Sequence, residues 1–551
     1  MKLRPICFAL AVLMLLACFA GCDNIAFSGI IGELLDSDLT EETDRRQPNG
    51  SESDMWAETE IGWPNGSESD MWAETEIGWT DEYESDLHSE IVTERPSQYE
   101  STVPAEPLDE YQIALDQLNA NLNGQDFTVL CRNDAGNSQI EMLCDESSSD
   151  PLENAVYTRN LLLAEKCGIN YVVSPVGTAD VITVIANDNK AGVGEYSLAM
   201  PNMQGAGTMA TRGHLRDFHD LPYIDLDAEW WDQGTAKMNI GGKLFWMNSD
   251  VNFLAHDVTF LILFSKVLAE KEGLDNLYET VENQEWTLDV FSSYIERVTH
   301  DANGDGKYDR NDTFGLIGTS STGSNLFYAS GLKYVECPED GEPYLCMSET
   351  DLDKASDLLY KVLEVFSESN YIVKPGEEDI AKGMFVANQG LFYNEVAGYI
   401  AGIQDMSDDF GVLPMPKYNK AQKNYQTWVH GISSTMVVPV GPQNAEDVSK
   451  VLECMAILSG KYVAPAYYDQ LLTRKTIKDH ESAGMLDIIF SNRIYDLVNY
   501  YTTELNLAGT FQSAVNRGTN SFSSSYSKAA SAAEKRLTRL INQFELSEVE
   551  G

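Results

Sequence analysis

The apolar and polar positions of residues 410–439 predict two strands separated by a polar loop. The apolar run Phe410–Leu413 predicts the first strand, and Pro414 and Pro416 end it because proline has no backbone N–H to donate to a sheet. After the loop, the apolar run 434–439 predicts a second, buried strand. This order of elements can carry a chain from one lobe to another past a cleft.

The pattern after residue 109 predicts a parallel sheet. Strands alternate with an amphipathic helix that Gly168 is placed to end. In order, the predicted elements are a helix at 111–118, a strand at 127–131, a helix at 151–166 and a strand at 169–173, and the segments 181–185 and 196–200 continue the pattern. Strand–helix–strand units of this kind are typical of α/β proteins.

Later apolar runs add further elements. They predict strands at 244–247 and 258–264, and helices at 287–298 and 447–458. Thr350 and Asp353 predict a capping box at the start of a further helix that runs to Phe366.

Length and charge limit the function classes. A chain of 551 residues is too long for one ordinary core, so two or more domains are expected. The formal net charge of −50 excludes a basic nucleic-acid-binding surface, because phosphate binding requires clustered Lys and Arg. No P-loop, HExxH or GxSxG motif occurs, so no catalytic site is predicted and we expect a protein that is not an enzyme.

The first 22 residues predict a bacterial lipoprotein signal peptide. Lys2 and Arg4 precede the apolar segment 6–19, which is too short for a permanent membrane span. Phe19-Ala20-Gly21-Cys22 resembles a lipobox, which implies cleavage after residue 21 and lipidation of Cys22. We therefore expect the protein on the outer face of a bacterial, Gram-positive cell membrane, held by a lipid anchor.

Residues 22–110 predict an acidic, disordered tether. Asp and Glu greatly outnumber Arg there and Lys is absent, so the segment has too little apolar surface to offset chain entropy. The 16-residue sequence PNGSESDMWAETEIGW occurs twice, at 48–63 and 64–79. Two copies are too few for a solenoid, which favours a duplication in a linker over a tryptophan-bearing contact motif.

A calcium-loop pattern lies at 301–312. Oxygen-bearing side chains recur at the spacing of a calcium-binding loop, with Gly306 where the chain must turn sharply. The alternative is an acidic turn that satisfies its own Asx hydrogen bonds. The expected ligands of a structural Ca²⁺ are Asp301, Asn303, Asp305, Lys307, Asp309 and Asp312.

The cysteines outside the signal segment show no zinc-ligand spacing. Cys337 and Cys346 could bridge a hairpin, and Cys131 with Cys144 is a weaker pair. Buried free thiols are the alternative.

Several stretches resemble the extracellular solute-binding proteins of family 1, the sugar-binding lipoproteins of ABC importers. The resemblance spans about 125–545 and is strong over the last 140 residues. It is carried by FGVLPMPKY at 410–418, by DPLENAVYTRNLLLAEKCGINYVV at 150–173 and by the C-terminal stretches APAYYD at 464–469 and MLDII at 485–489. Ser265 stands where the family usually has Asn.

The resemblance implies an α/β, two-lobe periplasmic-binding-protein-like fold of type II that closes on its ligand by hinge motion. The implied first lobe is about 111–260 and 430–480, and the second is about 261–429 and 481–551. The implied function is capture of a solute, a carbohydrate above all, for ABC permease subunits, by a monomer. Binding to a peptide, or a non-transport adhesin role, stays open.

A sugar site needs aromatic faces and planar polar groups. The expected stacking residues are Trp230, Trp231, Tyr393 and Trp428. The expected hydrogen-bonding residues are Asn133, Asp134, Asn325, Asn394, Glu395 and His430. Asn133 and Asn394 rest on their family positions, at strand ends that face the cleft.

Overall fold

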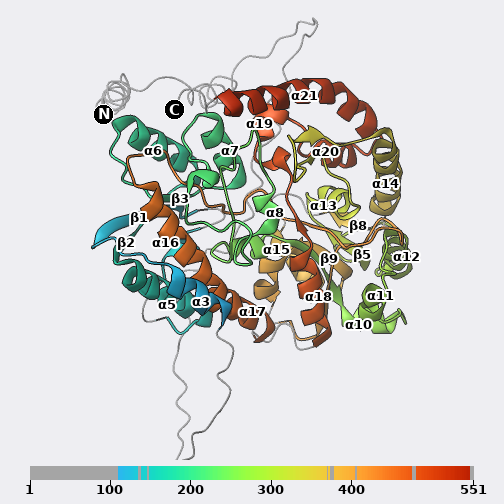
Figure 1. The fold of residues 1–551 in the computed structure, drawn as a ribbon. Helices are drawn as coiled ribbons and strands as arrows, with labels where there is room; N and C mark the ends of the chain where they lie inside the picture. The colour runs from blue at the N-terminus through green and yellow to red at the C-terminus, as the bar shows by residue number, and fades with distance from the viewer. Residues whose placement is uncertain are drawn as a thin grey trace, which may run out of the picture. The chain divides into compact units, whose positions relative to one another are not determined.

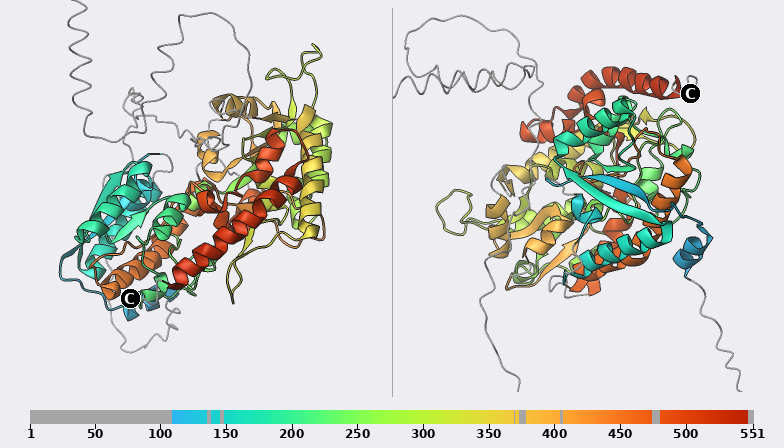
Figure 2. Two further views of the ribbon diagram at one scale, coloured as in Figure 1. Left: turned by 90° about the horizontal axis from the view of Figure 1, so that it is seen from above. Right: turned by 90° about the vertical axis from the view of Figure 1, so that its left-hand side faces the viewer.

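The computed structural model describes residues 109–134, 138–144, 148–368, 370–372, 378–403, 406–473 and 480–546 (Figures 1 and 2). The expected signal segment, Cys22, the tether and its repeats lie outside these residues. Within the described part of the chain, no helix combines the length and apolar character needed to cross a membrane.

Two sheets dominate the described residues, and the α/β class predicted from the sequence is confirmed. The first sheet is parallel, in the order β2-β1-β3 (Ile169–Val176, Gln125–Arg132 and Leu198–Met200). The second is mixed, in the order β10-β4-β9-β5-β8 (Phe410–Leu413, Phe260–Ser265, Gly390–Val396, Phe314–Gly318 and Asn370–Ile372). Two small pairs add β6 with β7 (Val335–Glu336 and Tyr344–Leu345) and β11 with β12 (Thr427–Trp428 and Arg493–Ile494).

Helices surround both sheets. Those in the first part of the chain are α3 (Glu110–Gln117), α4 (Gln139–Met142), α5 (Pro151–Cys167), α6 (Thr178–Ala191), α7 (Met203–Thr211), α8 (Gln233–Ala236), α9 (Leu254–Asp257), α10 (Lys266–Lys271), α11 (Leu277–Glu282) and α12 (Leu288–Val298). Those that follow are α13 (Thr322–Ala329), α14 (Glu349–Glu368), α15 (Glu378–Val386), α16 (Ala445–Leu458), α17 (Ala464–Thr473), α18 (His480–Ser491), α19 (Thr502–Leu505), α20 (Thr510–Asn516) and α21 (Phe522–Leu546).

Local sequence explains the clearest elements. Asp150 caps α5 by accepting hydrogen bonds from the Leu152 and Glu153 amides, and Gly168 ends the helix in the left-handed conformation with φ of 58°. In β4, the side chains of 260, 262 and 264 pack into one core cluster and those of 261 and 263 into another. Both faces of the second sheet are therefore covered, which explains why β4 is apolar throughout.

The chain crosses between the sheets where the pattern of 410–439 predicts. β10 pairs with β4 in the second sheet. Met436 and Val437 then bridge to Met247 and to Ala199 of β3, beside the first sheet. We call the part built on the first sheet the first lobe and the part built on the second sheet the second lobe. Two segments, which we call the crossing segments, connect them: residues 248–259, between Met247 and β4, and residues 414–435, between β10 and Met436.

Three predictions about local structure were wrong. Residues 244–247 and 434–439 are buried and extended, but they form isolated bridges instead of strands, because their partners lie in different segments. The capping box of α14 is formed by Ser348 and Asp351, not by Thr350 and Asp353: the Asp351 amide donates to Ser348 Oγ at 3.2 Å, and the Ser348 amide donates to Asp351 Oδ2 at 3.0 Å.

The six cysteines of the described residues are free thiols. Cys346 lies opposite Tyr334 in the β6–β7 register, where Glu336 pairs with Tyr344. Cys337 is therefore displaced from Cys346 by three positions, or about 10 Å along the strand. A hairpin disulfide between them is excluded by this spacing.

Candidate functional site

The carboxyl ends of β1 and β3 in the first sheet, and of β9 in the second, lie next to the crossing segments. β1 and β3 end at Arg132 and Met200, and β9 ends at Val396. The Ala397 amide donates to Thr259 O at 2.9 Å, and the His430 amide donates to Val258 O at 3.0 Å. Carboxyl ends of strands are where open α/β sheets bind ligands, so this junction is the candidate site.

Arg132 ties the first lobe to the crossing segment. Its guanidinium is buried and donates from Nε to Met200 O at 3.3 Å and from Nη2 to Ile432 O at 3.1 Å. Burial lowers the pKa of Arg132 to about 10. The end of β1, the end of β3 and the crossing segment are thus fixed by one side chain.

Glu141 of α4 binds both crossing segments. Its fully buried carboxyl is 2.6 Å from Ser434 Oγ and accepts a hydrogen bond from the Leu254 amide at 3.0 Å. Desolvation raises the pKa of Glu141 to about 8, although Ser434, Leu254, Arg132 and Arg159 act in the opposite direction. At neutral pH this carboxyl is therefore mostly protonated.

Asn133 and Asp134 lie just beyond β1 and are exposed. The backbone N–H of Asn133 donates to the Val176 carbonyl oxygen at 3.1 Å, so the Asn133 side chain takes no part in that hydrogen bond. Asp134 receives the Thr178 amide on Oδ2 at 2.7 Å and the Thr178 hydroxyl on Oδ1. Asp134 thus serves the start of α6 while remaining open to solvent.

Trp428 has both ring faces covered. Phe260 stacks on it with a centroid distance of 5.4 Å and Tyr328 with one of 5.3 Å. Neither face is open to stack on a sugar. Its Nε1 and the neighbouring Thr427 Oγ1 are buried without a hydrogen-bond partner among the described residues.

His430 lies beside this aromatic stack. Its ring centroid is 5.4 Å from that of Trp428, and the Ile432 amide lies 3.2 Å from its Nδ1. Burial lowers the pKa of His430 to about 4, so the ring is neutral at pH 7 and accepts that bond.

Four predicted site residues are buried around β9. Asn325 Nδ2 donates to Asn394 Oδ1 at 2.9 Å, and Asn394 Nδ2 donates to Leu261 O at 3.0 Å. Tyr393 is fully buried, and its hydroxyl donates to Glu395 Oε2 at 3.3 Å. These side chains are paired with one another inside the second lobe, so ligand contact with them requires a rearrangement.

Trp230 and Trp231 share a buried carboxyl on α16. Trp230 Nε1 donates to Glu453 Oε1 and Trp231 Nε1 donates to Glu453 Oε2, each at 2.9 Å. Burial raises the pKa of Glu453 to about 7. Trp231 packs in the first-lobe core, whereas Trp230 is partly exposed and keeps part of its surface available.

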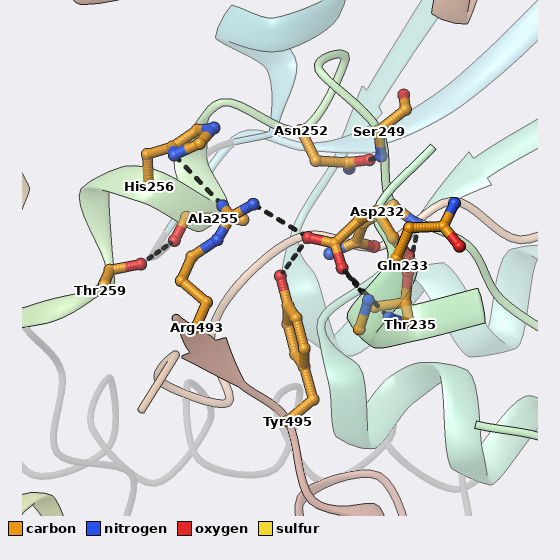
Figure 3. Close-up of polar contacts among 12 residues, drawn as sticks. Asp232, Gln233, Thr235, Ser249, Asn252, Ala255, His256, Thr259, Arg493 and Tyr495 are labelled. Atoms are coloured by element: carbon orange, nitrogen blue, oxygen red, sulfur yellow. Dashed lines mark hydrogen bonds and ion pairs between the residues drawn. The ribbon is translucent and has the colours of Figure 1, made fainter. Parts of the chain in front are cut away.

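A polar cluster that sequence reasoning missed joins the two lobes (Figure 3). Arg493 of β12 pairs with Asp232 Oδ2 at 2.9 Å, and its Nη1 lies 3.2 Å from His256 Nδ1. The Tyr495 hydroxyl donates to the same Asp232 oxygen at 3.0 Å. Arg493 and Tyr495 follow the C-terminal stretch 485–489 by a few residues, but their partner Asp232 lies some 260 residues earlier, and no spacing in the sequence signals that contact.

The calcium-loop oxygens accept hydrogen bonds from their own loop. Asp301 accepts the Gly304 amide on Oδ1 and the Gly306 amide on Oδ2, and Asp312 Oδ1 accepts the Ala302 amide at 2.9 Å. Among the described residues, no group of three or more His, Cys, Asp or Glu side chains is placed to hold a metal ion. These are the hydrogen bonds expected of an acidic turn whose carboxylates accept from backbone N–H groups of the same loop. Calcium binding by this loop stays a prediction.

No protein-family model and no curated protein sequence matches the chain. Solved structures do resemble it. The GacH receptor of Streptomyces glaucescens, described unliganded and with acarbose, aligns with 12% identity over 76% of this chain and 99% of that chain, with a TM-score of 0.47. The cyclic alpha-maltosyl-1,6-maltose binding protein of Arthrobacter globiformis aligns with 14% identity over 76% of this chain and all of that chain, with a TM-score of 0.48.

The maltose/maltodextrin-binding domain MalE of Bdellovibrio bacteriovorus, bound to maltotriose, has 14% identity, a TM-score of 0.46 and the same coverage as the Arthrobacter protein. Scores and identities of this size assign no ligand to this chain.

Proposed function

We propose that this chain captures an extracellular solute for an ABC importer and that the solute is a carbohydrate. The observation that carries the proposal is the junction itself. Strand ends of two separate sheets meet crossing segments that include His430 and Ile432. Such a junction can close on a ligand by hinge motion.

The residues at the junction suit a polyhydroxylated ligand. Exposed Asn133 and Asp134 offer planar polar groups, and the partly exposed His430 offers ring surface. Trp230 packs against Tyr111 of α3 and bonds to Glu453 of α16, so it is not counted with this surface. Trp231, Asn325, Tyr393, Asn394, Glu395 and Trp428 are proposed to support this surface from behind, because their side chains are buried. Lipidation of Cys22, an extracellular location, permease subunits as partners and a structural Ca²⁺ in the 301–312 loop complete the proposal.

A thermal-shift screen of the full chain against mono- and oligosaccharides tests this function. Binding to the folded state raises the melting temperature by mass action, by an amount that grows with ligand concentration. The expected result is a shift with one glycan class that Asn133→Ala and Asp134→Ala reduce. A shift with peptides and none with sugars would contradict the carbohydrate assignment and retain solute capture.

A further inference from the structure

The two lobes also meet at a turn outside the crossing segments. Gly241 and Gly242 form a two-residue turn, with φ of 59° and 70°, between Ile240 and Lys243, which exchange backbone hydrogen bonds. Leu244, the residue that follows, packs with residues of the first sheet, whereas Ile240 and Phe245 pack in the cluster that contains Phe544. The turn therefore extends from the first lobe and lies at its boundary with the second.

The β6–β7 hairpin of the second lobe reaches this turn. Glu342 Oε2 accepts the Gly241 amide at 2.8 Å. Glu339 Oε1 lies 2.9 Å from Lys237 Nζ. Both carboxylates come from the connection between the two short strands, so the hairpin presents two acceptors to one short stretch of the first lobe.

The end of α21 covers the other side of the turn. Phe544 packs on Phe245 with a centroid distance of 4.8 Å, and Gln543 Nε2 donates to Thr211 O at 2.8 Å. A Cβ at position 241 would lie 2.7 Å from Ile541 O. Glycine is therefore required at 241 both for its φ and for this close approach.

The beginning of α21 is bound to the second lobe. Ser523 Oγ lies 2.6 Å from Ser356 Oγ of α14, and Phe522 packs against Phe327 of α13. A helix of this length spans roughly 35–40 Å, so one rigid element reaches from the second lobe to the first. Figure 1 shows α21 running from α14 and α20 toward α7 and α19.

We propose that the hairpin connection and the end of α21 form a clasp that holds the lobes together and opens when the hinge moves. The clasp comprises Lys237, Gly241 and Phe245 of the first lobe and Glu339, Glu342 and Phe544 of the second. A rotation of one lobe against the other about the crossing segments displaces the turn at 241–242 relative to α21. The clasp contacts must therefore break when the lobes rotate. The inference rests on the proposed function in one respect: solute capture is the reason for the hinge movement that opens the clasp.

The polar contacts of the hairpin suit repeated opening. The side chains of Lys237 and Glu339 are 54% and 79% exposed, and pairs so exposed contribute little. Glu342 is exposed as well, so its bond to the Gly241 amide can be exchanged for water. The rings of Phe245 and Phe544 are buried, so the end of α21 is the stronger half of the clasp. No clasp contact is a buried ion pair, so release leaves no buried charge without a partner.

The test uses spin labels on the full chain without ligand. The labels are attached to genetically encoded ketone-bearing amino acids, so that the native thiols are not modified. These amino acids replace the exposed residues Val193, in the first lobe, and Tyr360, in the second. Phe544→Ala and Glu342→Ala are each expected to broaden the distance distribution between the labels. Hydrogen exchange at the Gly241 amide is expected to become roughly tenfold faster, or more, in Glu342→Ala.

A matched control exists in the same hairpin. Glu336→Gln removes a carboxylate whose ion pair, with Lys333 Nζ at 2.6 Å, stays within the second lobe. This variant is expected to keep the wild-type distance distribution.

Unchanged distances and unchanged Gly241 exchange in a folded Glu342→Ala would overturn the clasp. Equal broadening in Glu336→Gln and Glu342→Ala would also overturn it, by showing a general loosening. Neither result depends on sugar binding, so failure of the clasp and failure of the proposed function are separate outcomes.

Discussion

The crossing segments and the clasp connect the same two lobes by opposite kinds of interaction. At the crossing segments, Glu141, Arg132 and Ser434 are buried and bonded to several segments each. At the clasp, the ion pair of Lys237 and Glu339 and the Glu342 carboxylate are exposed, and the one aromatic pair described, Phe245 with Phe544, is buried but carries no charge. Buried polar networks are costly to break and so fix one geometry, whereas exposed contacts exchange with water at little cost. The difference suggests a permanent hinge and a releasable contact.

Removing Arg493 should have the largest effect on the permanent junction. Arg493→Met leaves Asp232 without its cation in a site where the two side chains are only 15% and 10% exposed. Loss of one member of a buried pair costs about 3–5 kcal/mol. Urea unfolding measures the change in the free energy of unfolding. Arg493→Lys keeps the charge but loses the planar guanidinium, so its loss of stability should lie between those of the wild type and Arg493→Met. A loss below about 1 kcal/mol would mean that the Arg493–Asp232 pair stabilises the fold no more than an exposed surface ion pair does.

Truncating Glu141 should be nearly as harmful. Glu141→Ala leaves Ser434 Oγ and the Leu254 amide without their carboxyl partner in the core. Unpaired buried polar groups cost about 1–3 kcal/mol each, so a loss of about 2–4 kcal/mol is expected by urea unfolding. Glu141→Gln, which can donate to one group and accept from the other, should be much milder. Equal losses in both variants would contradict the hydrogen-bonding account.

The same residue gives a pH dependence with a defined sign. The pKa of Glu141 is about 8 in the folded state and about 4.5 in the unfolded chain, so the folded state holds a proton that the unfolded state has lost. This contribution is present below about pH 4.5 and declines as pH rises to about 8. The free energy of unfolding of the wild type, measured from pH 5 to 8, should fall more steeply than that of Glu141→Gln. Parallel curves would contradict it.

The exposed ion pair of the clasp should have the smallest effect. Lys237→Ala removes the partner of Glu339 and should change the free energy of unfolding by less than about 1 kcal/mol. The effect should shrink further in high salt, because exposed charges are screened. A loss comparable to that of Glu141→Ala would remove the distinction between the two junctions.

Elements with strong local signals could be predicted from the sequence. The run 410–413 and its proline stop predicted β10 with its observed bounds, and Gly168 marked the end of α5, whose predicted range of 151–166 is one residue short of the observed helix. The segments 244–247 and 434–439 could not be placed correctly, because their hydrogen bonds depend on partners in several other segments. The apolar character of these two segments predicts that they are buried, but it does not predict whether they form a continuous ladder of strand hydrogen bonds.

The candidate site was predicted less well than the fold. Sequence chemistry marked Trp428 as a stacking residue, but Phe260 and Tyr328 occupy its two faces. Asn325 and Asn394, chosen separately, bond to each other across 69 positions. Side-chain type predicts which groups can bind a ligand, whereas their partners depend on contacts between distant segments.

The free thiols give each lobe its own chemical reporter. Burial raises the pKa of Cys131, in the first sheet, and of Cys337 and Cys346, beside the β6–β7 hairpin, to about 12. A rise of about three pH units lowers the reactive thiolate fraction roughly a thousandfold at neutral pH. Cys131 is buried, so its alkylation requires the first sheet to open, whereas Cys337 and Cys346 are partly exposed and react slowly through their small thiolate fraction. Mass spectrometry of alkylated peptides would therefore report opening of the first sheet against the slow, direct reaction of the hairpin thiols.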